Sequence, residues 1–333
     1  FMQALDTTIV NTALAAMAKD LHEDPLHMHG IVVAYVLSVA VCIPLSGWLA
    51  DRFGVRNTYF AAIIIFTLAS LGCGLSENFN QLLIFRVIQG IGGALLLPIG
   101  RLAMLKIIPR TQFLSAMSLM SLAGLLGPLM GPTLGGWLVE VATWHWIFLI
   151  NLPMGILGIL VTFKAMPNSK EKYVKPFDFL GFILLTIAMV GLSLGIEQAS
   201  NQNSTLWMSL ALVLIGLIAS AYYAYHAHTH HNALFRSDLF KNKIYAIGIA
   251  GNFFARFAGN AMPFLMPLML QVAFGFAPFM TGLLMIPTVL GSLASKPFVR
   301  PLIQYFGYRN VLISNTILIG LCIASFALST AET

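Results

Sequence analysis

The sequence predicts an all-α polytopic membrane protein, and three observations support this fold class. Hydrophobic residues make up 58% of the 333 residues and charged residues only 9%, with a mean hydropathy of +0.85. A soluble domain carries about 25% charged residues, so most of this chain is expected to lie in a bilayer. The apolar runs reach the roughly 20 residues that a spanning helix needs. They lack the alternation of a membrane β-barrel, which leaves helices as the way to satisfy the backbone in lipid.

The apolar runs predict about eleven helices in chain order, separated by short polar connections. We expect these helices at residues 1–18, 29–50, 58–76, 81–104, 113–139, 145–164, 179–198, 206–227, 244–270, 278–299 and 310–329. The chain starts without Met inside such a run, so we expect residues to precede it. The three cysteines all lie within the runs, which speaks against a disulfide framework.

Basic residues gather on alternate connections between the helices. Most of the Lys and Arg residues lie near 51–57, 105–112, 164–178, 228–243 and 296–309, whereas the opposite connections hold a single lysine beside several acidic residues. By the positive-inside rule, the basic connections are cytoplasmic. The net charge of +6 is spread over five separate loops, so it indicates membrane orientation and no nucleic-acid partner.

A short internal repeat relates two distant turns of the chain. Phe53-Gly54-Val55-Arg56-Asn57 recurs as Phe306-Gly307-Tyr308-Arg309-Asn310 at an offset of 253 residues, and a proline precedes each glycine by ten positions. The second copy lacks the Asp-Arg pair that precedes the first. The first copy joins the second and third helices, and the second copy joins the tenth and eleventh. The second half of the protein is therefore expected to begin at the ninth helix.

This repeat predicts the domain organisation, because repeated halves are the usual plan of secondary transporters. We expect an N-terminal six-helix bundle at residues 1–164, an inserted helix pair with cytoplasmic linkers at 165–243, and the start of a C-terminal bundle at 244–333. Completing the second bundle requires about fourteen helices in total. We therefore expect this chain to be a C-terminal truncation of a longer protein.

The first copy of the repeat belongs to a charged turn that we interpret as a cytoplasmic gate. Gly47 allows close helix approach and Gly54 allows a tight turn. Asp51 can accept hydrogen bonds from the N-terminus of a neighbouring helix, and Arg52 and Arg56 can pair with carboxylates of another helix. The alternative interpretation is a solvated turn that serves topology alone.

An arginine lies within the apolar fourth helix. An intramembrane Arg costs about 2.5–3.5 kcal/mol to insert and usually faces a cavity or a partner. Gln89 shares the helix face of Arg86, and Gly90 and Gly93 allow another backbone to come close. We expect Arg86 and Gln89 to line a cavity, with snorkelling of Arg86 to the outer interface as the alternative.

Small residues recur along one face of the fifth helix. Gly127, Gly131 and Gly135 form a small-xxx-small stripe that permits tight helix packing. Pro132 follows one of these glycines and bends the helix by removing a backbone donor, and Gly136, next to Gly135, is counted with the same seam. We interpret this stripe as a seam that takes part in motion. A packing seam without a mechanism is the alternative.

Two further helices carry candidate residues for proton coupling and substrate binding. Asp6 lies in the apolar first helix, and a buried carboxylate can load and release a proton. Asn11 lies nearby on a polar face, while a structural role for Asp6 is the alternative. In the ninth helix, Arg256 lies between Asn252 and Asn260 and is a second intramembrane cation candidate.

The sequence gives little support for metal binding or enzymatic catalysis. A cluster at the end of the eighth helix, His226, His228, His230 and His231, has the residue type of a metal site. No Cys or carboxylate is near it, so we predict no metal. The sequence holds no nucleophile, phosphate-loop or zinc signature, and we predict that the protein is no enzyme.

Five motifs together resemble those of the major facilitator superfamily and, within it, the fourteen-helix drug:proton antiporters. The resemblance covers the whole chain. The motifs are Leu5–Leu14, Gly47–Asn57, Leu82–Ala94, Gly127–Leu138 and Trp144–Pro153.

The resemblance implies a proton-coupled exporter, a multidrug efflux antiporter of the bacterial inner membrane that works by alternating access between two bundles. It implies the bilayer, protons and a small-molecule substrate as partners, a proton gradient as the energy source with no cofactor, and a monomer. Asp6 would couple protons and Arg86 would tune that carboxylate or hold substrate. An exporter of a small organic acid, suggested by Arg86 and Arg256, is the first alternative. A non-transporting membrane sensor or scaffold is the second.

Overall fold

The computed structural model describes residues 1–166, 168–171, 173–200, 206–230, 232–235, 241–270, 274 and 278–325. Within these residues every regular element is a helix, as expected from the composition. The chain divides into two compact units, Phe1–Lys241 and Asn242–Thr333. The boundaries predicted at 164/165 and 243/244 for three domains stay predictions, because the division into compact units addresses a different grouping.

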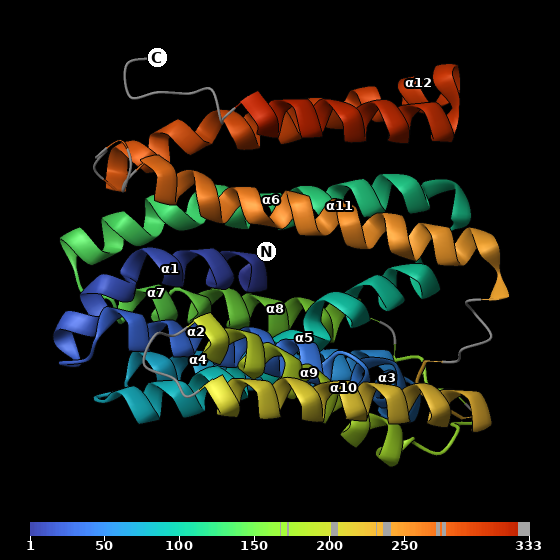
Figure 1. Cartoon of the computed structure of the whole chain (residues 1–333), viewed down its shortest axis with the longest axis horizontal. Helices are drawn as coiled ribbons and strands as arrows, with labels where there is room; N and C mark the ends of the chain where they lie inside the picture. The colour runs from blue at the N-terminus through green and yellow to red at the C-terminus, as the bar shows by residue number, and fades with distance from the viewer. Residues whose placement is uncertain are drawn as a thin grey trace. The chain divides into compact units, whose positions relative to one another are not determined.

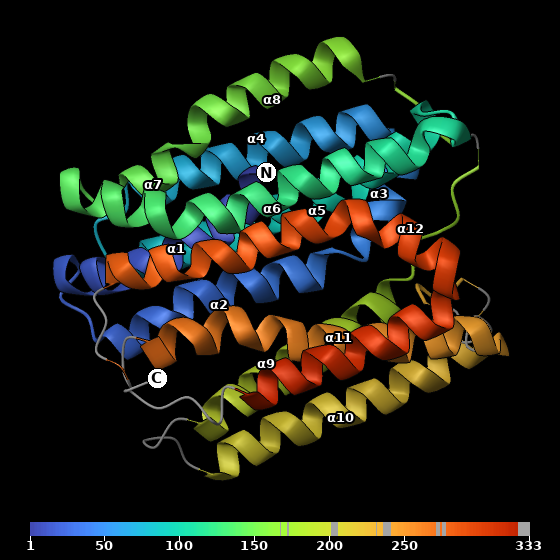
Figure 2. The same ribbon diagram turned by 90° about the horizontal axis from the view of Figure 1, so that it is seen from above.

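The first unit is a bundle of helices whose axes run side by side in both ribbon views (Figures 1 and 2). Its described helices are α1 Met2–Asp20, α2 Pro25–Cys42, α3 Leu45–Phe53, α4 Val55–Gly74, α5 Phe79–Ile107, α6 Arg110–Val141, α7 Trp146–Leu149, α8 Asn151–Ala165, α9 Phe179–Ser200 and α10 Leu206–Thr229. By length and composition, five described helices qualify as membrane spans, and α2 with α3 forms a sixth, bent one.

One predicted helix of the first unit is broken and another is continuous. The helix expected at 29–50 is broken at Ile43 and Pro44, and its two parts, α2 and α3, are bent by 57°. A proline within a helix removes a backbone donor and clashes with the preceding turn, which accounts for the break. The helix expected at 145–164 is present as α7 and α8, which continue into one span through Ile150, whose φ of −60° and ψ of −22° are helical.

The charged loop expected at 51–57 is a one-residue turn. Helix α3 continues to Phe53 and α4 begins at Val55, so Gly54 alone separates them. Gly54 has φ 91° and ψ 148°, a conformation that only glycine adopts readily. The tight turn predicted at Gly54 is therefore confirmed, and the turn is shorter than the sequence suggested.

The second unit contains α11 Lys243–Leu268 and α12 Pro278–Ser325 among its described residues. The two helices expected at 278–299 and 310–329 are both present within α12 and meet at a kink, so the connection between them is shorter than the loop that the sequence suggested. Only Gly307 within α12 leaves the helical conformation, with φ 77° and ψ 157°. As at Gly54, a glycine supplies the turn without a longer connection.

The core of the first unit consists of two clusters of buried side chains. One cluster joins α1, α2, α5 and α7 through residues such as Met17, Met28 and Phe148. The other joins α2, α4 and α5 through residues such as Tyr35 and Phe66. Helices α9 and α10 pack against each other through glycines, and they lie in the same unit as α1 to α8. A polar network lies among the helices of these two clusters.

Candidate functional site

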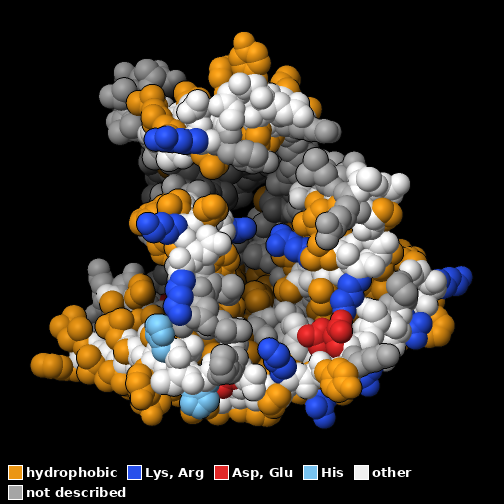
Figure 3. Space-filling view, turned by 90° about the vertical axis from the view of Figure 1, so that its right-hand side faces the viewer, with side chains coloured by type: hydrophobic (Ala, Val, Ile, Leu, Met, Phe, Trp, Pro, Cys, Tyr) orange, Lys and Arg blue, Asp and Glu red, His pale blue; other side chains and the backbone are white. Residues whose placement is uncertain are grey.

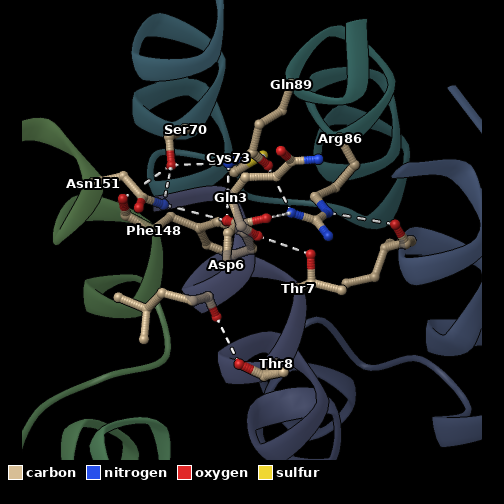
Figure 4. A network of polar contacts seen from close by, with 12 residues as sticks. Gln3, Asp6, Thr7, Thr8, Ser70, Cys73, Arg86, Gln89, Phe148 and Asn151 are labelled. Atoms are coloured by element: carbon tan, nitrogen blue, oxygen red, sulfur yellow. Dashed lines mark hydrogen bonds and ion pairs between the residues drawn. The ribbon is translucent and has the colours of Figure 1, made fainter. Parts of the chain in front are cut away.

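The centre of this network is an ion pair between α1 and α5. Asp6 Oδ2 lies 2.7 Å from Arg86 Nη1, and both residues are fully buried (Figure 4). Asp6 reaches this position because it lies on the same face of α1 as the core residues Ile9 and Ala13, which are three and seven positions later. The two residues that the sequence proposed for proton coupling are therefore in direct contact.

Arg86 is held by aromatic rings as well as by Asp6. The guanidinium carbon lies 4.2 Å from the centre of the Tyr35 ring and 5.7 Å from that of Phe148, a geometry that favours a cation. Nε donates to the Ile31 carbonyl at 3.4 Å. The snorkelling alternative for Arg86 is therefore wrong in this structure, since its charge is neutralised by a buried partner.

Gln89 connects Asp6 to two further helices. Its Nε2 donates to Asp6 Oδ1 at 3.0 Å and to Ser70 Oγ of α4 at 3.1 Å. Its Oε1 accepts from Arg86 Nη1 at 2.6 Å. Asn151, the first residue of α8, donates from Nδ2 to Asp6 Oδ1 at 3.2 Å and to Ser70 Oγ at 3.0 Å. Four helices thus contribute to one buried polar cluster.

Sequence reasoning did not identify Ser70 or Asn151 as site residues. A signal was available for Asn151, because it lies in the Trp144–Pro153 motif and is polar within an apolar run. Ser70 carried no comparable signal, since a single serine in an apolar helix commonly bonds to its own backbone. In this structure, its hydroxyl donates instead to the Phe148 carbonyl at 3.0 Å.

Of the remaining predicted site residues, Asn11 faces away from this cluster and Arg256 belongs to the second unit. Asn11 is exposed, because five positions along a helix turn a side chain by about 140° from Asp6. Arg256 belongs to the second unit, where it is exposed and its Nε donates to Asn252 Oδ1 at 3.2 Å. A place of Arg256 in the substrate cavity stays a prediction.

The glycines of α5 bring its neighbours close to the cluster. A Cβ atom at Gly90 would lie 2.7 Å from the Tyr35 carbonyl oxygen of α2, and one at Gly93 would lie 2.9 Å from the Tyr35 hydroxyl. Gly92, which the sequence analysis did not single out, packs as closely on the Phe66 amide of α4. The close approach predicted for Gly90 and Gly93 is confirmed, and Tyr35 is the residue that both of them accommodate.

The glycine stripe of α6 packs on α1, the helix that carries Asp6. Gly127 faces the backbone of residues 4 and 5, and its carbonyl accepts from Thr8 Oγ1 at 3.3 Å. Gly131 faces Thr8, and Gly135 faces Ile9 and Thr12. The tight packing predicted for these three glycines is confirmed. The seam lies inside the first unit.

Two other residues of the predicted seam, Gly136 and Pro132, differ from the three packed glycines. A Cβ atom at Gly136 would have open space around it, so its predicted place in the seam is wrong. Pro132 is partly buried, and α6 continues as one helix from Arg110 to Val141. A role of the seam in motion stays a prediction.

The predicted gate residues make other contacts than those expected. A Cβ atom added at Gly47 would meet no described atom within 4 Å, so the close helix approach expected there stays a prediction. Arg52 lies over the Trp48 ring at 5.3 Å, and Arg56 lies over the Phe163 ring at 5.8 Å. Within the described residues neither arginine forms an ion pair with a carboxylate. Both cations instead lie against aromatic rings of the same unit, where cation–π attraction favours them.

A linker between α8 and α9 covers this turn. The Asp51 carbonyl accepts from the Glu171 amide at 3.3 Å, and the Val55 amide donates to the Ser169 carbonyl at 3.2 Å. Trp48 Nε1 donates to the Lys175 carbonyl at 3.2 Å. Figure 3 views the molecule from the right of Figure 1, the side toward which α3 lies, and Lys and Arg side chains are plentiful there. The contacts of the turn are therefore made with a segment that the sequence predicted only as a basic cytoplasmic linker.

The histidine cluster has a partner that the sequence did not indicate. His226 Nε2 lies 2.9 Å from Asp178 Oδ1, and both side chains are buried. Asp178 also accepts from the Gly181 amide at 2.9 Å, at the start of α9. The expectation that no carboxylate is near the cluster is wrong, because α9 and α10 pack side by side. His231 lies outside the described residues.

Comparison with known proteins agrees with this architecture. The family model described as "Major Facilitator Superfamily" matches residues 1–332. A protein of Pectobacterium atrosepticum named "Putative multidrug resistance protein MdtD" is 51% identical over 328 residues, which cover 98% of this chain and 70% of that protein. A protein of the same name from Salmonella dublin is 50% identical over 325 residues, covering 98% of this chain and 68% of its own.

Solved transporters share the fold at low sequence identity. A mutant of the peptide transporter POT, crystallised with sulfate, superposes with a TM-score of 0.61 at 16% identity, covering 92% of this chain and 68% of its own. A D-xylose–proton symporter gives 0.56 at 15% identity, with coverages of 91% and 66%. The family match and the two named relatives, with the membrane helices described above, mark a multi-pass membrane transporter and no enzyme. The chain belongs to the major facilitator superfamily.

Proposed function

We propose that the chain belongs to a proton-coupled exporter in which Asp6 carries the transported proton and Arg86 is its counter-ion. The observation that carries this proposal is the ion pair of 2.7 Å between two fully buried side chains on different helices. Ionisable groups inside membrane bundles are expensive and commonly mark ion or proton pathways. Asp6 is such a group, and its charge is matched by only one cation within the described cluster.

The ion pair links protonation to conformation. A proton on Asp6 removes the negative charge, and Arg86 is then left with the Gln89 carbonyl and the rings around it. An uncompensated buried charge costs several kcal/mol, about 3–5 when one partner is removed. A rearrangement that rehydrates Arg86 would relieve this cost. Proton loading would therefore favour a different arrangement of α1 and α5, as alternating access requires.

The substrate proposal comes from the relatives and from the charge of the site. Two curated relatives carry multidrug resistance in their names, so we propose multidrug efflux as the activity. An organic acid as substrate was suggested by Arg86 and Arg256. Because Asp6 neutralises Arg86, that alternative now depends mainly on Arg256, which is exposed in the second unit.

The proposal also covers which end of the protein faces the cytoplasm and which membrane holds it. The basic linker and the Gly54 turn meet at one end of the first unit, and the positive-inside rule assigns this end to the cytoplasm. The relatives are bacterial, which supports the inner membrane. We propose a monomer that uses the proton gradient as its energy source and needs no cofactor.

Asp6→Asn tests the proposal, because the amide keeps the shape of the carboxylate and cannot carry a proton at physiological pH. We expect loss of efflux driven by a proton gradient, measured in proteoliposomes with cationic drugs and, separately, with organic acids. Asp20→Asn is the matched control. Asp20 lies near the end of the same helix, where it accepts from Trp144 Nε1 at 2.8 Å, and this variant should retain efflux.

The outcomes separate the alternatives. Full gradient-driven efflux by Asp6→Asn would exclude Asp6 as the proton carrier. Wild-type transport of organic acids without transport of drugs would favour the acid exporter. Proton release on addition of a drug to wild-type protein, absent from Asp6→Asn, is the result that the proposal expects.

A further inference from the structure

The hydrogen bonds around Asp6 Oδ1 form a closed ring. Two acceptors, Asp6 Oδ1 and Ser70 Oγ, alternate with two amide donors, Gln89 Nε2 and Asn151 Nδ2, and each amide donates to both acceptors (Figure 4). An amide nitrogen has two hydrogens, so both nitrogens are fully used. The Ser70 hydrogen is given to the Phe148 carbonyl. This ring therefore fits an ionised Asp6, whose oxygen only accepts.

A protonated Asp6 does not fit the same ring. A proton on Oδ1 makes this oxygen a donor, yet both of its neighbours in the ring are N–H groups. One oxygen on the side chains that form the ring is free to accept. Within the described residues, Asn151 Oδ1 is buried and has no hydrogen-bond partner. A buried polar atom without a partner is uncommon and calls for an explanation.

We propose that Asn151 is a positioning residue that serves both protonation states of Asp6, donating to the carboxylate and accepting from the protonated acid. This inference rests on the proposed function, in which Asp6 takes up a proton. The proton binds Asp6 Oδ1, and the Asn151 amide rotates by half a turn. Its Oδ1 then takes the place of Nδ2 and accepts the O–H of Asp6.

The exchange leaves the hydrogen-bond inventory nearly balanced. In either orientation one polar atom of the Asn151 amide points where the described structure offers no partner. After the rotation, Asn151 no longer donates to Ser70 Oγ, which still accepts from Gln89 Nε2. The Ser70 hydroxyl keeps its own hydrogen bond to the Phe148 carbonyl. The clash between two donors that protonation would otherwise create is removed. An amide suits this task because it carries a donor and an acceptor of similar size on one group.

The surroundings leave Asn151 as the group for this role. The titratable side chains around Asp6 are Arg86 on α5, Tyr35 on α2 and Cys73 on α4, whose thiol donates to Gln89 Oε1 at 3.8 Å. Arg86 faces the other carboxylate oxygen and has no acceptor to offer. Gln89 Oε1 already accepts from Arg86 and Cys73. Asn151 alone among the members of the ring holds an unused acceptor.

Its place in the chain gives the rotation a consequence. Asn151 is the first residue of α8, three positions after Phe148 of α7, whose carbonyl accepts from Ser70 Oγ. The side chain that responds to Asp6 therefore lies on the span that α7 and α8 form together. A change in the protonation of Asp6 on α1 thereby changes the hydrogen bonds of Asn151 on α8.

Infrared difference spectroscopy tests the inference on the transporter reconstituted in nanodiscs. Spectra are recorded between alkaline and acidic pH for wild-type protein, for protein carrying ¹³C at its asparagine side-chain carbonyls, and for Asp6→Asn, Asn151→Leu and Asn80→Leu. Asn80 is exposed in the first turn of α5 and is the matched control. The labelled wild-type protein keeps the test independent of whether Asn151→Leu folds.

We expect a carboxylic-acid band that Asp6→Asn abolishes, accompanied by an amide carbonyl band that shifts with the ¹³C label. Asn151→Leu should abolish the amide band and shift the Asp6 acid band to higher frequency, because the acid loses its acceptor. Asn80→Leu should change neither band.

The possible failures are distinguishable. Absence of any acid band that depends on Asp6 would overturn the proposed function, and the inference with it. An Asp6 band without a label-sensitive amide band would overturn the inference alone. An amide band that persists in Asn151→Leu would assign the response to another asparagine and would also overturn it.

Discussion

Gly54 and Gly307 lie 253 residues apart and adopt nearly the same backbone conformation, with φ 91° and ψ 148° at the first and φ 77° and ψ 157° at the second. Each follows a phenylalanine at the end of one helical segment and precedes the next. The repeat in the sequence is therefore also a repeat of backbone geometry. This shared geometry supports the comparison of the two halves.

Replacing Gly54 should destabilise the turn for two reasons. A side chain at this φ and ψ costs about 1–3 kcal/mol in backbone strain, and a Cβ atom would clash with the side chain of Asn168. At Gly307 a Cβ atom would meet open space within the described residues. We therefore expect Gly54→Ala to lower the thermal unfolding temperature in detergent more than Gly307→Ala does.

Adding Asn168→Ala to Gly54→Ala separates the two causes. The second substitution should recover the part of the loss that comes from the clash and leave the part that comes from strain. Equal unfolding temperatures for Gly54→Ala and wild type would contradict the assigned turn geometry.

Adding a methyl group at Gly131 should push α6 away from α1. Its Cβ atom would overlap the Thr8 hydroxyl, and the neighbouring Ile9 amide would lie at 3.2 Å. Overpacking of this kind costs about 1–3 kcal/mol, so we expect Gly131→Ala to unfold at lower temperature. Gly136→Ala on the same helix has open space and should unfold like wild type. Similar losses for both variants would show that helix propensity or lipid contact, and not the seam, sets the effect.

Removing Arg86 alone should be worse than removing it together with the charge of Asp6. Arg86→Gln leaves Asp6 as a buried carboxylate without a counter-ion, a loss of about 3–5 kcal/mol. The double variant Asp6→Asn/Arg86→Gln removes both charges and should unfold at a higher temperature than Arg86→Gln. Thermal unfolding of the wild type, both single variants and the double variant forms a double-mutant cycle. Additive losses would mean that the two side chains are not coupled.

We expect Trp48 to keep the linker between α8 and α9 in place over the gate turn. This side chain donates to the Lys175 carbonyl and packs on Phe177 at 5.1 Å between ring centres. Trp48→Ala removes both contacts, so we expect faster trypsin cleavage after Lys170 and Lys175, measured by the rate of appearance of fragments.

Two controls define the contribution of each contact. Trp48→Phe keeps the ring and loses the hydrogen bond, and it should give an intermediate cleavage rate. Lys106→Gln removes an ion pair of 3.0 Å with Glu171 that is partly exposed, which contributes at most about 1 kcal/mol. If trypsin cleaved Lys106→Gln as fast as Trp48→Ala, the ion pair would be the contact that keeps the linker in place.

Much of the fold could be predicted from the sequence because lipid imposes strong local rules. Long apolar runs must be helical, and the helices expected around residues 58–76 and 179–198 were found within a few residues of those limits. The identity of Asp6 and Arg86 as unusual residues also followed from the sequence, since ionisable groups are rare in such runs. The glycine stripe on α6 was evident from its spacing.

The partners of these residues could not be predicted, because contacts between helices depend on how their faces meet. The face of α1 that carries Asp6 turned toward Arg86, while Asn11 on the same helix turned away. Gly136 directly follows the last glycine of the stripe, and a Cβ atom added there still meets open space. A helix has a fixed repeat, but its rotation about its own axis is set by its neighbours.

The sequence by itself determined the membrane class, the family motifs, the paired glycine turns and the buried charges, since each of these depends on local composition or on spacing along the chain. Only the tertiary structure decided that Asp6 is matched by Arg86, and that Ser70 and Asn151 complete the ring around it. These four side chains come from four helices. Their meeting depends on long-range packing, which single-helix patterns do not encode.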